Sequence, residues 1–290
     1  MREMARIIGA AAVCGALLLV LTTAGQAKGD PSLSWSPSTG GGFGYGLLGV
    51  GHATSETFTL TNSGRSASAA LTITLSGAAA FTITEDTCSE TSLGPNKSCT
   101  VTVQYAPTAS GPSGGATLNA TGKKEAATAD LALSGSAALE FHANGPAAPG
   151  LSGLNENPQH PESSATGTTV VFWDTTTSTM SVKVVFSGLT TPNTAAHIHC
   201  CIAAPGNAGV ATTTPTFTGF PGGVTSGTYT HVFNMLDSSS WNPAFIASHG
   251  GTAASAATAL LAGLQAGQAY MNIHTQMFGG GEVRGFVAPA

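Results

Sequence analysis

Histidine is the side chain of this sequence best suited to metal chemistry, and its distribution is uneven. Seven of the eight histidines lie after residue 137. His197 and His199 stand two apart in a predicted strand, so both should point to one face of a sheet and Ile198 to the other. His274 lies on a later predicted strand. If the two strands are neighbours, three imidazoles meet, and such a set with an open coordination position suits copper or zinc.

A purely structural use of these histidines is the alternative. Strand histidines often bond backbone carbonyls and hold a loop in place. Near them, Glu282 and Arg284 share one face of a predicted strand, which favours an ion pair within the strand or across to its neighbour. Glu156 is placed to pair with Arg284 or to orient a histidine as an outer-shell partner. We find no serine in a nucleophile elbow and no glycosidase-like pair of carboxylates, so we predict no catalytic residue and favour a non-enzymatic protein.

Cysteine usage favours an oxidising compartment. Four cysteines remain after the first 27 residues, as two local pairs. Cys88 and Cys99 flank a turn between predicted strands, which favours a structural disulfide over buried thiols. Cys200 and Cys201 follow His199 directly. Adjacent Cα atoms lie about 3.8 Å apart across a trans peptide, below the usual disulfide range. A strained vicinal bridge, free thiols and thiolate ligands beside the histidines all stay open.

The N-terminus has the pattern of a secretory signal peptide. Arg2 and Arg6 precede an apolar run, Ile7–Leu21, and the small residues that follow end at Ala27. The run is shorter than the roughly 20 residues that a spanning helix needs. We therefore expect cleavage near Ala27, export to the cell envelope or the medium, and no membrane span in the mature chain.

Composition excludes one class of partner and indicates the fold class. Charged residues make up 8% of the chain, and without residues 1–27 it has 7 basic and 13 acidic side chains. Seven scattered cations on an acidic chain provide no basic surface for nucleic acid. Val, Ile, Thr and Phe recur in alternating runs, which indicates folded β-structure. The length fits two domains, and we predict an all-β protein of two tandem β-sandwiches.

The first predicted domain, residues 31–137, has about seven short alternating runs separated by turn signals, which is typical of an immunoglobulin-like sandwich. Residues Phe58–Gly64, Cys88, Leu93–Val101 and Tyr105–Thr108 resemble the choice-of-anchor D group of Ig-like domains, related to the abnormal-spindle and Hydin type. That resemblance implies a spacer or adhesive module of exported bacterial proteins, without catalytic residues.

The second predicted domain, residues 138–290, continues the strand pattern and has one predicted helix, roughly Ala253–Leu264. Its motifs are Leu151–Pro158, Ser187–Thr191, Ala195–His199, Tyr270–Thr275 and Gly281–Gly285. Together they resemble the CHRD domain, first described in chordin, which implies an extracellular β-sandwich module whose chordin relatives bind protein ligands. We expect a Greek-key sandwich here.

A fainter resemblance links Gly188–Thr190, His197–His199 and the late strand histidine, His274, to copper–zinc superoxide dismutase. It implies that His197, His199 and His274 are copper ligands. The histidines and aspartate of the dismutase zinc loop have no match, so dismutase activity is not expected.

Two functions follow from these patterns. The first is an exported Ig-like spacer that presents a CHRD module to another extracellular protein or surface component. The second is a secreted or periplasmic protein that binds copper or zinc at the histidine trio.

Overall fold

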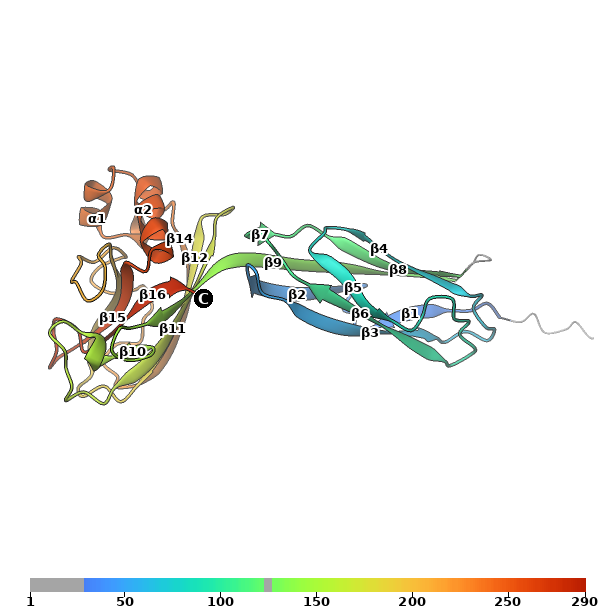
Figure 1. The fold of residues 1–290 in the computed structure, drawn as a ribbon, viewed down its shortest axis with the longest axis horizontal. Coiled ribbons are helices and arrows are strands. Elements are labelled where there is room, and N and C mark those ends of the chain that lie inside the picture. The colour runs from blue at the N-terminus through green and yellow to red at the C-terminus, as the bar shows by residue number, and fades with distance from the viewer. Residues whose placement is uncertain (1–28, 123–126) are drawn as a thin grey trace, which may run out of the picture.

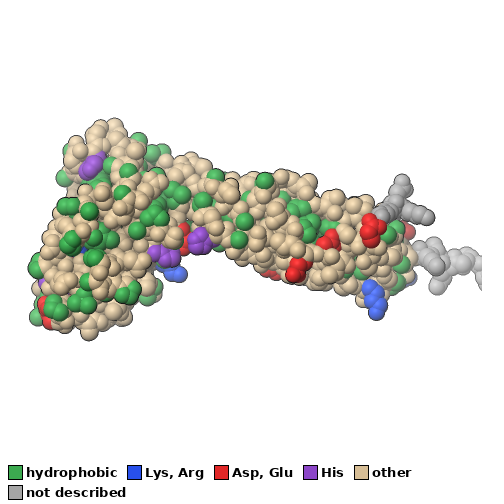
Figure 2. Space-filling model, viewed as in Figure 1, with side chains coloured by type: hydrophobic (Ala, Val, Ile, Leu, Met, Phe, Trp, Pro, Cys, Tyr) green, Lys and Arg blue, Asp and Glu red, His purple; other side chains and the backbone are tan. Residues whose placement is uncertain are grey.

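The protein is all-β, as predicted. The computed structural model describes residues 29–122 and 127–290, so the predicted signal peptide lies outside the described residues. Strands dominate this part of the chain, accompanied by two α-helices. None of the described helices is long and apolar enough to cross a membrane. The face seen in Figure 2 carries few charged side chains, as the low charge content leads one to expect.

The N-terminal part folds around its own hydrophobic core. One sheet has the order β1-β3-β6-β5. On the opposing side β2, β7 and β8 pair with β9, and β4 pairs with β8. The bounds are β1 Leu33–Ser36, β2 Gly42–Gly49, β3 Thr54–Asn62, β4 Leu71–Gly77, β5 Phe81–Asp86, β6 Ser98–Tyr105, β7 Gly111–Pro112, β8 Ala116–Gly122 and β9 Thr128–Asn144.

Period-2 alternation builds this core. Phe58 and Leu60 of β3 and Val101 and Val103 of β6 are fully buried, while the threonines between them, Thr59 and Thr102, are less deeply buried. Cys88 and Cys99 form the predicted disulfide, with their Cα atoms 5.2 Å apart.

The glycine-rich segment at β2 was not predicted as a strand. It pairs in parallel with β9, from Gly42 beside Ala132 to Gly49 beside Ala138.

Strand β9 runs through both halves of the molecule. Its 17 residues pair with β2, β7 and β8 at one end and with β11 and β16 at the other. The alternating runs Ala129–Leu133 and Leu139–His142 suggested two separate strands here, on either side of the predicted domain limit at residue 137. Figure 1 shows one continuous strand between the two bodies. The proposed domain limits stay a prediction.

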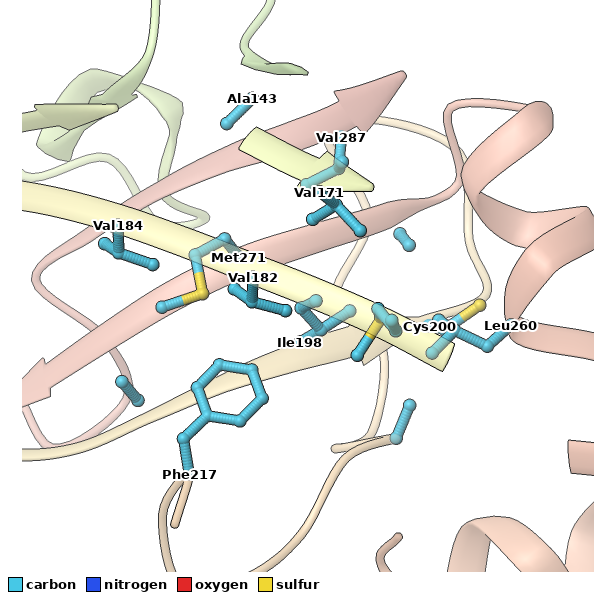
Figure 3. Close-up of a cluster of buried hydrophobic side chains, with 14 of the residues drawn as sticks. Ala143, Val171, Val182, Val184, Ile198, Cys200, Phe217, Leu260, Met271 and Val287 are labelled. Carbon is cyan, nitrogen blue, oxygen red and sulfur yellow. The ribbon is translucent and has the colours of Figure 1, made fainter. Parts of the chain in front are cut away.

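The C-terminal part is a curled sheet around a second core. From one edge the strands run β14-β12-β11, continue through β9 and β10, and end with β16-β15-β13. Their bounds are β10 Leu151–Ser152, β11 Thr166–Asp174, β12 Thr179–Ser187, β13 Asn193–Cys200, β14 Gly227–Asn234, β15 Ala269–Thr275 and β16 Val283–Pro289. Figure 3 shows part of this core, in which Val171, Val182 and Val184 of β11 and β12 lie in one cluster with Ile198 of β13 and Met271 of β15.

Helices cover one end of this core. The predicted helix is α2, Ala253–Gln265, whose N-terminus has a capping box of Thr252 and Ser255. It buries Leu260 and Leu264 in the core. A shorter helix, α1 (Pro243–Ser248), precedes it, and the 3₁₀ turns are Gly153–Asn155 and Ser238–Ser240.

Candidate metal centre

Two adjacent strands bring the three histidines together. β13 and β15 are antiparallel, with His197 opposite Asn272, His199 opposite Tyr270 and Ala195 opposite His274. Because side chains alternate along a strand, all three imidazoles leave the sheet on one face. The residues between them, Ile198 and Ile273, enter the hydrophobic core on the other face, where Figure 3 shows Ile198.

The rings converge at one place. One nitrogen from each of His197, His199 and His274 lies within 4.8 Å of those of the other two. The ring centroids are 5.3–5.8 Å apart. Nitrogens bound to one tetrahedral ion at about 2.0–2.1 Å lie about 3.3 Å from each other, so small ring rotations bring the trio into coordination range.

Hydrogen bonds fix which nitrogen of each ring is free. Backbone carbonyls contact His197 Nε2 (Pro215, 2.6 Å), His199 Nδ1 (Ala208, 2.9 Å) and His274 Nδ1 (Gly279, 3.0 Å). A carbonyl accepts only from N–H, so in each neutral ring the other nitrogen carries a lone pair. Those nitrogens, His197 Nδ1, His199 Nε2 and His274 Nε2, are buried and have no hydrogen-bond partner.

The charge state of the rings fits metal binding. Burial lowers the pKa of His197 and that of His199 from 6.5 to about 4. Burial also lowers the pKa of His274. All three rings are therefore neutral at pH 7, and their lone pairs are available without the loss of a proton.

A second group of side chains holds the loop over the trio. Tyr270 stacks on His199 with ring centroids 4.8 Å apart, and its hydroxyl donates to Ala208 O at 3.1 Å. Arg284 lies over the Tyr270 ring at 4.7 Å. Its guanidinium donates to the carbonyls of Asn155, Pro205 and Gly206 and to the side chain of Asn207. Arg284 thus anchors the segment that carries the carbonyl acceptor of His199.

Glu282 and Arg284 have separate partners and do not form a pair within their predicted strand, whereas the suggested neighbourhood of Glu156 and Arg284 is found. Glu282 precedes β16, and its buried carboxylate accepts hydrogen bonds from Ser163, Thr190 and Thr275. These donors lower the pKa of Glu282 despite its burial. Arg284 instead has Glu156 at 3.7 Å. Burial raises the pKa of Glu156 to about 8.

Cys200 and Cys201 form a vicinal disulfide, so free thiols and thiolate ligands, the other possibilities left open by the sequence, do not apply. The peptide between them is cis rather than trans, and the Cα atoms are 3.1 Å apart. Cys200 is buried on the core face of β13, opposite the side that carries His199.

Sequence reasoning missed two features of this site: the carbonyl acceptors of the histidines and the buried carboxamide of Asn272. The carbonyls of Pro215, Ala208 and Gly279 lie in loops, and a backbone group leaves no signal in residue types. Sequence patterns predicted no function for Asn272, whose Oδ1 is buried without a partner. Its position two residues before His274 was the available signal.

Comparison with known proteins identifies one domain. The CHRD domain family model matches residues 148–287, the part of the chain that contains all three histidines. No curated protein matches the chain. The resemblance of the N-terminal part to choice-of-anchor D domains stays a prediction.

Some solved structures are similar to part of this chain. VesB protease of Vibrio cholerae is 22% identical with a TM-score of 0.28, and the match covers 36% of this chain and 31% of that one. The human CEP192 ASH/PapD-like domain is 15% identical with a TM-score of 0.27, covering 44% of this chain and 97% of that one. The secreted serine protease VesC of Vibrio cholerae is 11% identical with a TM-score of 0.30, covering 66% and 42%. Scores this low carry no argument about this chain.

Proposed function

We propose that the C-terminal part of this protein binds one divalent transition-metal ion through His197 Nδ1, His199 Nε2 and His274 Nε2. One observation carries the proposal: three buried imidazole nitrogens without partners lie together, while a carbonyl holds the other nitrogen of each ring. Metal-binding histidines have this arrangement, in which a second partner fixes the tautomer and the ring orientation.

A purely structural role explains the environment of only one of the two nitrogens of each ring. The carbonyl bonds account for one nitrogen of each ring. A buried polar atom that lacks a hydrogen bond costs about 1–3 kcal/mol, and the trio has three such atoms side by side. A metal ion satisfies all three at once.

Nitrogen donors suit copper and zinc, and the general order of affinities places Cu²⁺ above Zn²⁺. We therefore expect copper to bind more tightly. Zinc in such a set supplies a Lewis acid, and copper adds one-electron chemistry. Among the residues that the structure describes, this trio is the one cluster of three or more His, Cys, Asp or Glu side chains arranged to hold a metal. We propose a mononuclear site.

The rest of the chain supports an extracellular setting for this proposal. Its two disulfides are typical of an oxidising compartment. An all-β fold with a CHRD domain is compatible with an extracellular binding or structural protein. We propose that the signal peptide exports the chain and that the N-terminal sandwich is a spacer for the metal-binding part.

Metal analysis of protein purified without a histidine tag tests the proposal. After chelation and reloading with Cu²⁺ or Zn²⁺, we expect one equivalent of metal in the wild type and loss of metal in His197→Ala, His199→Ala and His274→Ala. His231→Ala is the matched control, because His231 lies on β14, outside the trio, and its variant should keep the metal. Retention of less than about 0.1 equivalent of metal by the wild type would contradict the proposal, since a preformed site of this kind should load. The alternative, an exported spacer that presents the CHRD module to another molecule, would then remain.

A further inference from the structure

Asn272 lies at the centre of the polar face that carries the histidines. On β15 it stands between Tyr270 and His274, two residues from each. Across the sheet it is opposite His197 on β13 and opposite Arg284 on β16. Directly opposed residues of antiparallel strands share a face, so the Asn272 carboxamide belongs to the same layer as the trio.

This carboxamide lacks a hydrogen bond that comparable groups make. Asn272 is 2% exposed, and its Oδ1 has no partner. The other buried asparagines are Asn62, Asn155 and Asn193, and the amide oxygen of each accepts a bond from a backbone N–H. Asn272 is therefore the exception among the buried asparagines of the described chain.

The backbone also closes over the Asn272 side chain. A Cβ at Gly281 would collide with the terminal atoms of the Asn272 amide, so the glycine lets the chain pass directly over this group. Gly281 follows Gly279, whose carbonyl contacts His274 Nδ1. Asn272 and His274 thus lie beneath one loop, and bulk water does not reach the carboxamide oxygen.

We infer that Asn272 Oδ1 accepts a hydrogen bond from the small molecule that completes the coordination of the metal. The inference rests on the proposed function. Three nitrogen ligands leave a position that water fills, and a metal-bound water has O–H groups that need acceptors in a buried site. Asn272 Oδ1 is an acceptor in that layer without a donor, so it can accept the hydrogen bond that the O–H group of the metal-bound water has to donate.

The inference defines the class of ligand for the open position. Molecules that carry a hydrogen on the bound atom, such as water or hydroxide, keep the bond to Asn272. A ligand with acceptor atoms alone, such as azide, must break it. Asn272 therefore acts as a specificity determinant that disfavours azide relative to water.

Asn272→Leu tests this reasoning, because leucine keeps the approximate shape and removes the acceptor. Thr169→Val is the matched control: Thr169 Oγ1 is also buried without a partner, but it lies on β11, which pairs with neither β13 nor β15. The probe is azide, titrated into each Cu²⁺-loaded protein and followed by the azide-to-copper charge-transfer band. A hydrogen bond of about 0.5–1.5 kcal/mol predicts that azide binds about two- to thirteenfold more tightly to Asn272→Leu than to the wild type.

The outcomes separate the inference from the proposed function. Tighter azide binding in Asn272→Leu alone, with one equivalent of copper retained, supports the inference. Equal or weaker azide binding in Asn272→Leu overturns it, as does an equal gain in Thr169→Val or the absence of an azide band in every loaded protein. In those cases the metal site itself stands. If the wild type takes up no copper, the proposed function fails first.

Discussion

Acidification of the metal-free protein should reveal the buried histidines directly. His197 and His199 have a pKa of about 4 in the folded protein and an ordinary value of 6.5. Between about pH 4 and pH 6.5 the unfolded chain therefore binds more protons at these two histidines than the folded protein does. The stability from their neutral burial is therefore present above pH 6.5 and is lost as the pH falls toward 4.

The size of the effect follows from the two pKa values. From pH 7 to pH 5 each histidine should lower the free energy of unfolding by about 2 kcal/mol, and the pair by about 4 kcal/mol. The assay is urea unfolding at both pH values in the presence of a chelator, followed by tryptophan fluorescence. Two of the three tryptophans, Trp173 and Trp241, lie in the C-terminal core and report on this part of the molecule.

A double variant isolates the contribution of the pair from other titrating groups. Replacing both histidines, His197→Gln with His199→Gln, removes the two titrations, so its loss of stability between pH 7 and pH 5 should be smaller by about 4 kcal/mol. If the wild type and the double variant lose the same stability over this range, the two imidazoles are not buried and neutral as described, and the reasoning fails.

Three further predictions concern the supports of the fold and the site. Cys99→Ser opens the Cys88–Cys99 loop of 11 residues and should cost somewhat under about 3 kcal/mol in urea unfolding; an unchanged midpoint would contradict a formed bridge. Glu282→Gln places an amide among hydroxyl donors and should cost about 2–4 kcal/mol by the same assay, whereas Glu85→Gln, at an exposed position of β5, should change little. Arg284→Lys loses the guanidinium contacts to the loop that carries Pro205 and Asn207. If these contacts orient His199, as outer-shell partners do, the affinity for copper measured by chelator competition should fall by about tenfold. An unchanged affinity would show that the loop needs no anchor.

The strand pattern was readable because each alternation has one buried face. Phe58 with Leu60 and Val101 with Val103 predicted core positions that the structure fully buries. The same period placed His197 and His199 together on one face. The pairing of β13 with β15, which brings in His274, depends on topology, and no local pattern encodes it.

The failures of sequence reasoning have physical causes. The glycines of β2 have no side chains with which to show alternation, yet their backbone pairs with β9. Glu282 and Arg284 were assigned to each other by spacing, but hydroxyl groups from distant segments satisfy the glutamate, and loop carbonyls satisfy the arginine. These hydroxyl and carbonyl partners appear only once the chain is folded, whereas the proximity of Glu156 to Arg284 was suggested by the sequence.

The continuous strand β9 determines how the molecule can be divided. A cut after residue 137 would break this strand within its ladder, leaving Ala138 and the residues beyond it without their covalent link to the N-terminal sheet. The strand spans roughly 50 Å at about 3.3 Å per residue, without an intervening linker. Tilting one body against the other therefore requires bending a paired strand. The strand thus limits how far the histidine face can move relative to the N-terminal sandwich.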